Sequence, residues 1–310
     1  MSNVKISLFG KLQIQYGNEQ KIQLEQRRAQ ELLCYLFLHR DHLHQREKLA
    51  TLFWPDSSPA QSKCYLRQTL WRVQSALNHS MQPKEQLLLA THEQIGVNQA
   101  ASYWLDVASL EQAFTAAKDK PGRELTETTA ELLRQAIRLY QGDLLEGWYQ
   151  DWCIYERERY QSIYLALLEK LLGYSEAHGA YPTGLEYGAQ ILRYDRAREQ
   201  THRRLMRLHL AAGNRALAIH QYKACVTALR EELNVAPDQH TTALYHKICR
   251  AENATVFSIA PQEPSLDVLD QQPETGTLQQ LAQIQARLLH LEGEVTALMN
   301  NLTRQHSYLA

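Results

Sequence analysis

The sequence predicts a mainly α-helical protein with a small β component, arranged in three parts. These are an N-terminal winged helix-turn-helix domain, a tetratricopeptide-like helical domain and a C-terminal coiled-coil helix. In the first 100 residues, short β-prone runs, amphipathic stretches and a hairpin follow one another in the order of a winged helix. A self-similarity with a period of 34 residues lies in a later block without strand signals. Near the end, aliphatic residues step by three and four over about three heptads.

The N-terminal domain, residues 1–100, begins with a predicted antiparallel sheet. Residues 4–24 alternate apolar and polar side chains in three runs, which are broken at Phe9-Gly10 and at Tyr16-Gly17-Asn18. A first helix follows from about residue 27, and a second over QREKLATLFWP ends at Pro55. A later hairpin is expected around His92-Glu93-Gln94.

The third helix of this domain is expected over residues 59–78. Ser57 or Ser58 can cap its N-terminus, and Pro59 suits the first turn. An apolar stripe at steps of four, three and four predicts that one side of the helix is buried, while polar side chains cover the other side. The stripe consists of Leu66, Leu70, Val73 and Leu77.

Residues 101–252 are expected to form a helical domain without strands. Helical patterns begin near residues 106 and 130, a long one runs from Asp151 through His178, and shorter ones start near 182, 198, 214 and 239. The 34-residue period pairs Ala177 and Gly179 with Ala211 and Gly213. This period is typical of stacked tetratricopeptide helix pairs.

The C-terminal part divides into a linker and a coiled coil. Residues 253–276 contain three prolines and no sustained helical period, which indicates a linker. Residues 277–310 carry an apolar heptad stripe, which predicts a homo-oligomer, a dimer first, with a trimer or tetramer left open. The alternative is that the stripe packs on the protein's own helical block. The expected oligomerisation residues are Leu281, Ile284, Leu288, Leu291, Val295, Leu298 and Leu302.

Composition narrows the functional classes. The net charge is −1, but residues 1–100 carry 12 Lys and Arg against 8 Asp and Glu, so the first block is +4 and the rest is −5. This asymmetry favours an N-terminal module that binds a polyanion. The five cysteines are far apart without a C-x-x-C motif, so no disulfide framework and no metal site are expected. A start without a leader peptide, and no long apolar tract, lead us to expect a cytoplasmic protein that does not contact a membrane.

Several motifs together resemble the bacterial activators typified by the streptomycete antibiotic regulatory proteins (SARP). They are LFG in the first strand, Leu66-Arg67-x-x-Leu70-x-x-Val73, the run LYQGDLLEGWYQDWCIYERERY over 139–160, and the segment beginning at Ala211 and closing at Tyr222. The resemblance spans about residues 3–251 and includes the closing segment LREELNVAPDQHTTALYHKI. It implies a winged helix followed by a bacterial transcriptional activation domain, with double-stranded DNA and RNA polymerase as partners.

The sequence departs from this family in three places. Gln74 follows Val73 where an Arg is usual, and the hairpin tip lacks a basic residue for phosphate. No phosphate-binding loop of the type G-x-x-x-x-G-K followed by Ser or Thr occurs, and the linker and coiled coil stand where larger members carry a nucleotide-hydrolysing domain.

The expected DNA contacts lie mainly on the third helix. Gln68 and Arg72 lie opposite the apolar stripe and suit base edges, whereas Lys63 and Arg67 flank it and suit phosphates. Trp71 also points outward, and we expect it to be a satellite core residue under the wing. The full set of candidate DNA-binding residues is Lys63, Tyr65, Arg67, Gln68, Arg72, Arg27 and Arg28.

Two groups of residues also have a purely structural interpretation. For Arg27 and Arg28, a contact with the DNA backbone and simple solvation are equally good interpretations, since adjacent arginines on a helix are often solvated. An aromatic cluster between residues 148 and 164 could line a ligand pocket, but aromatic stripes in helical arrays usually form core. The cluster consists of Trp148, Tyr149, Trp152, Tyr155, Tyr160 and Tyr164.

The predicted function is therefore a sequence-specific DNA-binding transcription regulator, which we expect to activate rather than repress transcription. The alternative is a tetratricopeptide-like adaptor that binds proteins and has lost DNA binding. No cofactor is expected, and an enzyme has little support, because neither H-E-x-x-H nor G-x-S-x-G occurs.

Overall fold

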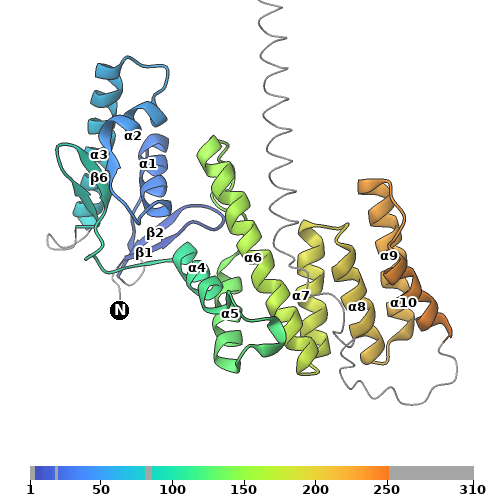
Figure 1. Cartoon of the computed structure of the whole chain (residues 1–310). Coiled ribbons are helices and arrows are strands. Elements are labelled where there is room, and N and C mark those ends of the chain that lie inside the picture. The colour runs from blue at the N-terminus through green and yellow to red at the C-terminus, as the bar shows by residue number, and fades with distance from the viewer. Residues whose placement is uncertain (1–3, 18–19, 81–85, 251–310) are drawn as a thin grey trace, which may run out of the picture. The chain divides into compact units, whose positions relative to one another are not determined.

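The N-terminal sheet contains one strand more than the sequence analysis expected. The computed structural model describes residues 4–17, 20–80 and 86–250 (Figure 1). The sheet has the order β3 (Gln20–Lys21), β2 (Gln13–Tyr16), β1 (Val4–Ser7) and β7 (Tyr103–Leu105). β1 pairs antiparallel with β2 and parallel with β7. The added strand β7 begins at residue 103, so this sheet is complete only at Leu105, five residues beyond the expected domain boundary.

The three expected helices follow the sheet. They are α1 (Arg27–Leu38), α2 (Arg46–Phe53) and α3 (Pro59–Ser80). At the start of α3 the Ser58 hydroxyl accepts a hydrogen bond from the Gln61 backbone N–H at 3.4 Å, as expected for a capping serine. The apolar stripe of α3 is buried over its whole length, which confirms the amphipathic prediction.

The expected hairpin forms the wing. It joins β5 (Leu88–Ala90) to β6 (Gln94–Val97), and β6 also pairs with the short strand β4 (His44–Gln45), in the order β4-β6-β5. The backbone N–H of Thr91 donates to the Gln94 carbonyl at 2.9 Å and closes the turn. We refer to residues 4–105 as the winged-helix unit.

Residues 106–250, which we refer to as the helical domain, contain no strand in the described structure apart from an isolated bridge between Phe9 and Leu144. A 3-10 turn lies at Gly122–Glu124. The helices are α4 (Asp106–Ala117), α5 (Glu127–Leu139), α6 (Asp151–Ala177), α7 (Tyr181–Tyr194), α8 (Glu199–Ala211), α9 (Arg215–Leu233) and α10 (Gln239–Arg250).

The structure confirms the 34-residue repeat. Gly179 follows α6 with φ = 68° and Gly213 follows α8 with φ = 77°, and glycine adopts this left-handed conformation most readily. Leu171 and Leu205, which are also 34 residues apart, are both buried. The helix pairs α6–α7 and α8–α9 are thus two copies of one unit, stacked side by side in Figure 1.

The predicted linker and coiled coil, residues 253–310, lie outside the described residues, and their heptad stripe remains a prediction. No helix among the described residues is long and apolar enough to cross a membrane.

Candidate nucleic-acid interface

Helix α3 presents its polar side to solvent. Away from the buried stripe, the side chains of Arg67, Gln68, Trp71 and Arg72 are exposed, and we call these four residues the exposed face of α3. Within the described residues, the side chains of Arg67 and Gln68 hydrogen-bond only to the Sγ of Cys64, each at 3.8 Å, a weak interaction that a stronger acceptor can replace. These two polar groups are therefore available for a ligand.

Trp71 is not where the sequence analysis expected it. It is 67% exposed, so the expectation of a satellite core residue under the wing is wrong. The wing faces an earlier part of α3, where Lys63, Leu66 and Arg67 line a groove with His92 and the rest of the hairpin tip. Trp71 lies one turn beyond that groove, so the wing does not cover it.

Lys63 and Tyr65 lie at the edges of the exposed face of α3. Lys63 Nζ forms an ion pair with Glu47 of α2 at 2.6 Å, and both side chains are largely exposed. The bond from Lys63 lowers the pKa of the Glu47 carboxyl. Tyr65 is partly exposed and its ring lies 6.1 Å from that of Trp54. Because an exposed ion pair is weak, Lys63 can exchange Glu47 for a phosphate at little cost.

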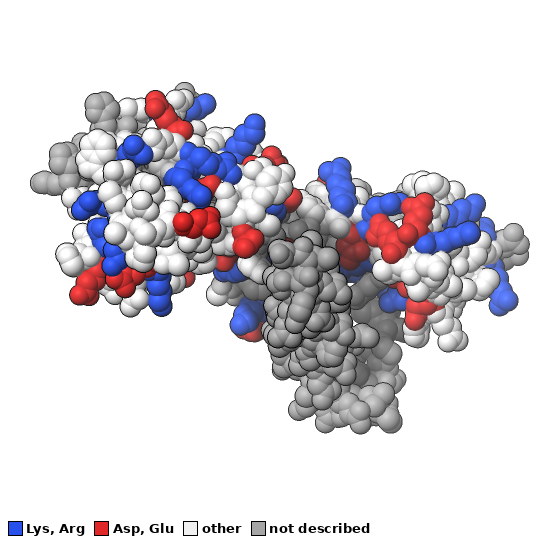
Figure 2. Space-filling view, turned by 90° about the horizontal axis from the view of Figure 1, so that it is seen from above, with Lys and Arg blue, Asp and Glu red and all other residues white. Residues whose placement is uncertain are grey.

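The groove between α2, α3 and the wing also contains a basic residue that sequence reasoning missed. Arg46, the first residue of α2, donates from Nε to the Thr91 carbonyl at the wing tip, at 2.9 Å. It thus places positive charge beside a hairpin whose own tip lacks any. Only the fold brings residues 46 and 91 together, so no local pattern could have revealed this contact. In Figure 2, Lys and Arg side chains lie over the winged-helix end, with carboxylates among them.

Arg27 and Arg28 are tied to a buried carboxylate at the start of α1. Glu31, 2% exposed, accepts from Arg27 at 3.1 Å and from Arg28 at 2.9 Å. The guanidinium of Arg27 also lies 3.9 Å from the centre of the Trp148 ring, in the helical domain. The other Glu31 contact is the Gln150 side-chain amide at 2.5 Å. Arg27 therefore packs at the junction of the two parts, while Arg28 stays half exposed.

Arg72 lies toward the same end of α1. Its guanidinium donates to the side-chain oxygen of Gln26, the residue before α1. This contact places Arg72 near the start of α1, whereas Lys63, Arg67 and Arg46 line the wing groove. Gln68 lies on the exposed side of α3 between them.

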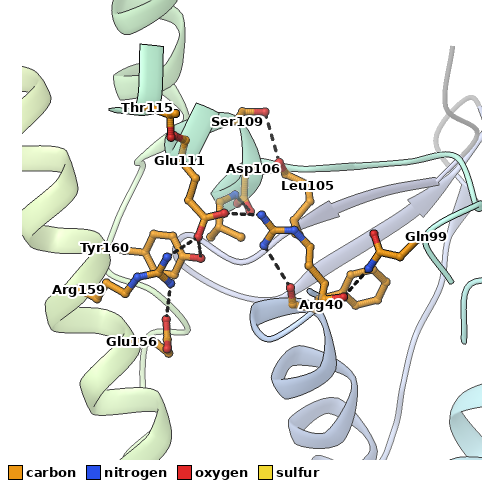
Figure 3. A network of polar contacts seen from close by, with 12 residues as sticks. Arg40, Gln99, Leu105, Asp106, Ser109, Glu111, Thr115, Glu156, Arg159 and Tyr160 are labelled. Carbon is orange, nitrogen blue, oxygen red and sulfur yellow. Dashed lines mark hydrogen bonds and ion pairs between the residues drawn. The ribbon is translucent and has the colours of Figure 1, made fainter. Parts of the chain in front are cut away.

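A second junction joins the winged helix to α4 and α6 (Figure 3). Glu111 of α4 bonds to Arg40, which follows α1, and on its other oxygen accepts from Arg159 at 2.7 Å and from the Tyr160 hydroxyl at 2.8 Å. Burial opposes ionisation of Glu111, but the hydrogen bonds from Arg40 and Tyr160 and the charge of Arg159 outweigh it and lower its pKa.

Asp106, the first residue of α4, binds the end of strand β1. One carboxylate oxygen accepts from the backbone N–H groups of Leu8 at 2.7 Å and Phe9 at 2.9 Å, and the other accepts from Val107 at 2.7 Å. Burial raises the pKa of Asp106 to about 6, although these three donors act in the opposite direction. The helical domain is therefore fixed to the winged helix by polar contacts as well as by packing.

The aromatic cluster is mostly core, as the more common alternative predicted. Trp148, Tyr160 and Tyr164 are buried, and Tyr160 packs edge-on against Phe9 with ring centres 5.9 Å apart. Two members do not belong to the core, because Tyr149 is 79% and Tyr155 is 72% exposed. Within the described residues, no group of His, Cys, Asp or Glu is arranged to hold a metal ion.

The helical domain matches a known family. Residues 105–249 match the family model described as the bacterial transcriptional activator domain. The chain carries a bacterial transcriptional activator domain. The resemblance to SARP-type regulators that the motifs predicted is confirmed, and the matched segment begins where the winged-helix sheet ends. This family consists of transcription regulators rather than enzymes.

A solved structure shares the fold over most of the chain. The structure of Mycobacterium tuberculosis EmbR in complex with a low-affinity phosphopeptide aligns over 82% of this chain and 67% of its own length, with 17% identity and a TM-score of 0.59. A C-terminal TPR-containing domain of a Plasmodium falciparum FK506-binding protein aligns over 46% of this chain and 90% of its own, with 13% identity and a TM-score of 0.34. No curated protein sequence matches significantly.

Proposed function

We propose that the protein is a cytoplasmic, sequence-specific DNA-binding regulator that activates transcription. Helix α3 enters the major groove, and the helical domain contacts RNA polymerase. The observation that carries the proposal is the winged helix itself: α3 buries its apolar stripe and leaves Arg67 and Gln68 without strong partners, directly beside a wing. An activator domain follows without an intervening linker, because β7 ends at Leu105 and α4 begins at Asp106.

The polar groups divide into two kinds of contact. Gln68 and Arg72 suit base edges, since Gln pairs with adenine and Arg with guanine in the major groove. Lys63 and Arg67, at the wing side, suit phosphates, which position the protein without reading sequence. Arg46 adds a further phosphate contact that offsets the missing basic residue of the wing. Arg27 serves the junction, and Arg28 remains available for the DNA backbone.

A dimer would strengthen this binding. One winged helix that reads one half-site binds weakly, and joining two copies makes the second contact intramolecular. The heptad stripe of residues 277–310 is the segment that we propose for this association.

The experiment is selection of bound sequences from a pool of random duplex DNA with the full chain. We expect enrichment of a defined motif, and binding that weakens steeply with salt because phosphate contacts release counterions. Retention of duplexes without any enriched motif, or no retention at low salt, would contradict the proposal and favour the protein-binding adaptor.

A further inference from the structure

Trp71 is a large, mainly apolar side chain that lies exposed on the surface of α3. It is the most exposed large apolar side chain of the described winged-helix unit. Among the described residues, no aromatic ring stacks on its indole and no Lys or Arg lies over it. An aromatic side chain that is mostly exposed in the free protein is available for a ligand.

The position of Trp71 on α3 points to DNA as that ligand. Arg67 and Gln68 precede it by four and three residues, so the three side chains share one side of the helix. The buried stripe faces away, and the wing groove includes Arg67 but not Trp71. When Arg67 and Gln68 meet a duplex, the indole meets it too, one turn further along the groove. A protein partner on this surface would have to displace the DNA.

We propose that Trp71 determines sequence specificity by packing against the C5-methyl group of a thymine in the major groove, an inference that rests on the proposed DNA-binding function. Thymine is the base that presents an apolar group at the major-groove edge. The indole offers a broad apolar face and one N–H donor, so it favours that methyl group over a bare pyrimidine edge. The operator therefore contains a thymine beside the base pairs read by Gln68.

The experiment compares the full chain with Trp71→Ala on the selected operator and on random duplex. The operator is also prepared with each thymine replaced in turn by deoxyuridine, which lacks only the methyl group. We expect Trp71→Ala to weaken operator binding about tenfold and random-duplex binding little, which is within the range of losing one specific base contact. One deoxyuridine replacement should weaken the unchanged protein about fourfold, equivalent to about 0.8 kcal/mol for one buried methyl group. The same replacement should leave Trp71→Ala unaffected.

Tyr149→Ala is the matched control, because it removes a similarly exposed aromatic side chain from outside α3. It should bind both duplexes like the unchanged protein. Circular dichroism should show that both variants are folded, as expected for exposed positions.

The outcomes separate this inference from the function on which it rests. Failure to select any motif contradicts the proposed function. A selected motif that Trp71→Ala binds as tightly as the unchanged protein overturns the inference alone. Equal weakening on operator and random duplex also overturns it, because the indole would then contact the DNA backbone. A deoxyuridine effect that persists in Trp71→Ala overturns it as well, because the indole would then contact no thymine methyl group.

Discussion

Replacing Asp106 by Asn tests the attachment of the helical domain to strand β1. The carboxylate accepts three backbone hydrogen bonds, from Leu8, Phe9 and Val107. An amide has one acceptor oxygen, and its NH2 group would face N–H donors. At least one buried N–H then loses its partner, so we expect Asp106→Asn to lower the free energy of unfolding at pH 7 by about 1 to 3 kcal/mol.

The pH dependence of this loss follows from the raised pKa of Asp106, about 6 in the folded chain against an ordinary value of 3.8. A carboxyl group whose folded pKa is raised adds stability at low pH, and that stability is lost as the pH rises through the folded pKa. The contribution amounts to about 1 kcal/mol at pH 5 and is nearly absent at pH 7. Because Asn does not titrate, the difference between the two proteins should grow by about 1 kcal/mol from pH 7 to pH 5.

The assay is urea unfolding of the full chain at both pH values, followed by circular dichroism and by tryptophan fluorescence. Only transitions that coincide for the two signals yield a usable free energy. Asp119→Asn, at an exposed position after α4, is the control and should leave the free energy of unfolding close to that of the unchanged protein. A difference that stays constant or shrinks at pH 5 would show that the three hydrogen bonds outweigh burial, and would refute the reasoning.

Three further predictions follow from the contacts described above. Lys63→Ala should weaken all duplexes alike and reduce the slope of log affinity against log salt by about one, whereas Glu47→Gln should strengthen binding by freeing Lys63; salt titrations measure both. Glu111→Gln should lower the free energy of unfolding by about 2 kcal/mol at pH 7, because Arg40 and Arg159 lose a half-buried carboxylate. The pKa of the Glu111 carboxyl is lowered from its ordinary value of 4.5, so this loss of stability should shrink when urea unfolding is measured below pH 4.5. Deletion of residues 277–310 should give a monomer in sedimentation equilibrium, and an unchanged oligomer would remove the coiled-coil hypothesis.

Sequence reasoning succeeded where structure follows from neighbouring residues. The apolar stripe from Leu66 to Leu77 defines both the existence and the buried side of α3, because helical periodicity is a local property. Gly179 and Gly213 mark two helix ends for the same reason, since each needs a left-handed backbone at one position.

It failed where distant segments meet. Strand β7 is three residues long and pairs parallel with β1, about a hundred residues earlier in the chain. No hairpin turn joins the two strands, so no local turn pattern could predict the pairing. The acceptor role of Asp106 depends on that same pairing. Glu31 looks like an ordinary solvated charge on α1, but Gln150 from the helical domain covers it. The prediction for Trp71 was wrong because the position of the wing relative to α3 is defined only in the folded chain.

The central claim, that α3 reads base sequence, is tested most directly by repeating the selection from random duplex with Gln68→Ala, alongside Lys63→Ala. Gln68 is exposed opposite the buried stripe, while Lys63 borders the wing groove. Gln68→Ala should lose base preference at one or two adjacent positions of the motif and keep the rest, and Lys63→Ala should return the full motif with lower recovery. A motif that Gln68→Ala leaves unchanged at every position would contradict the account.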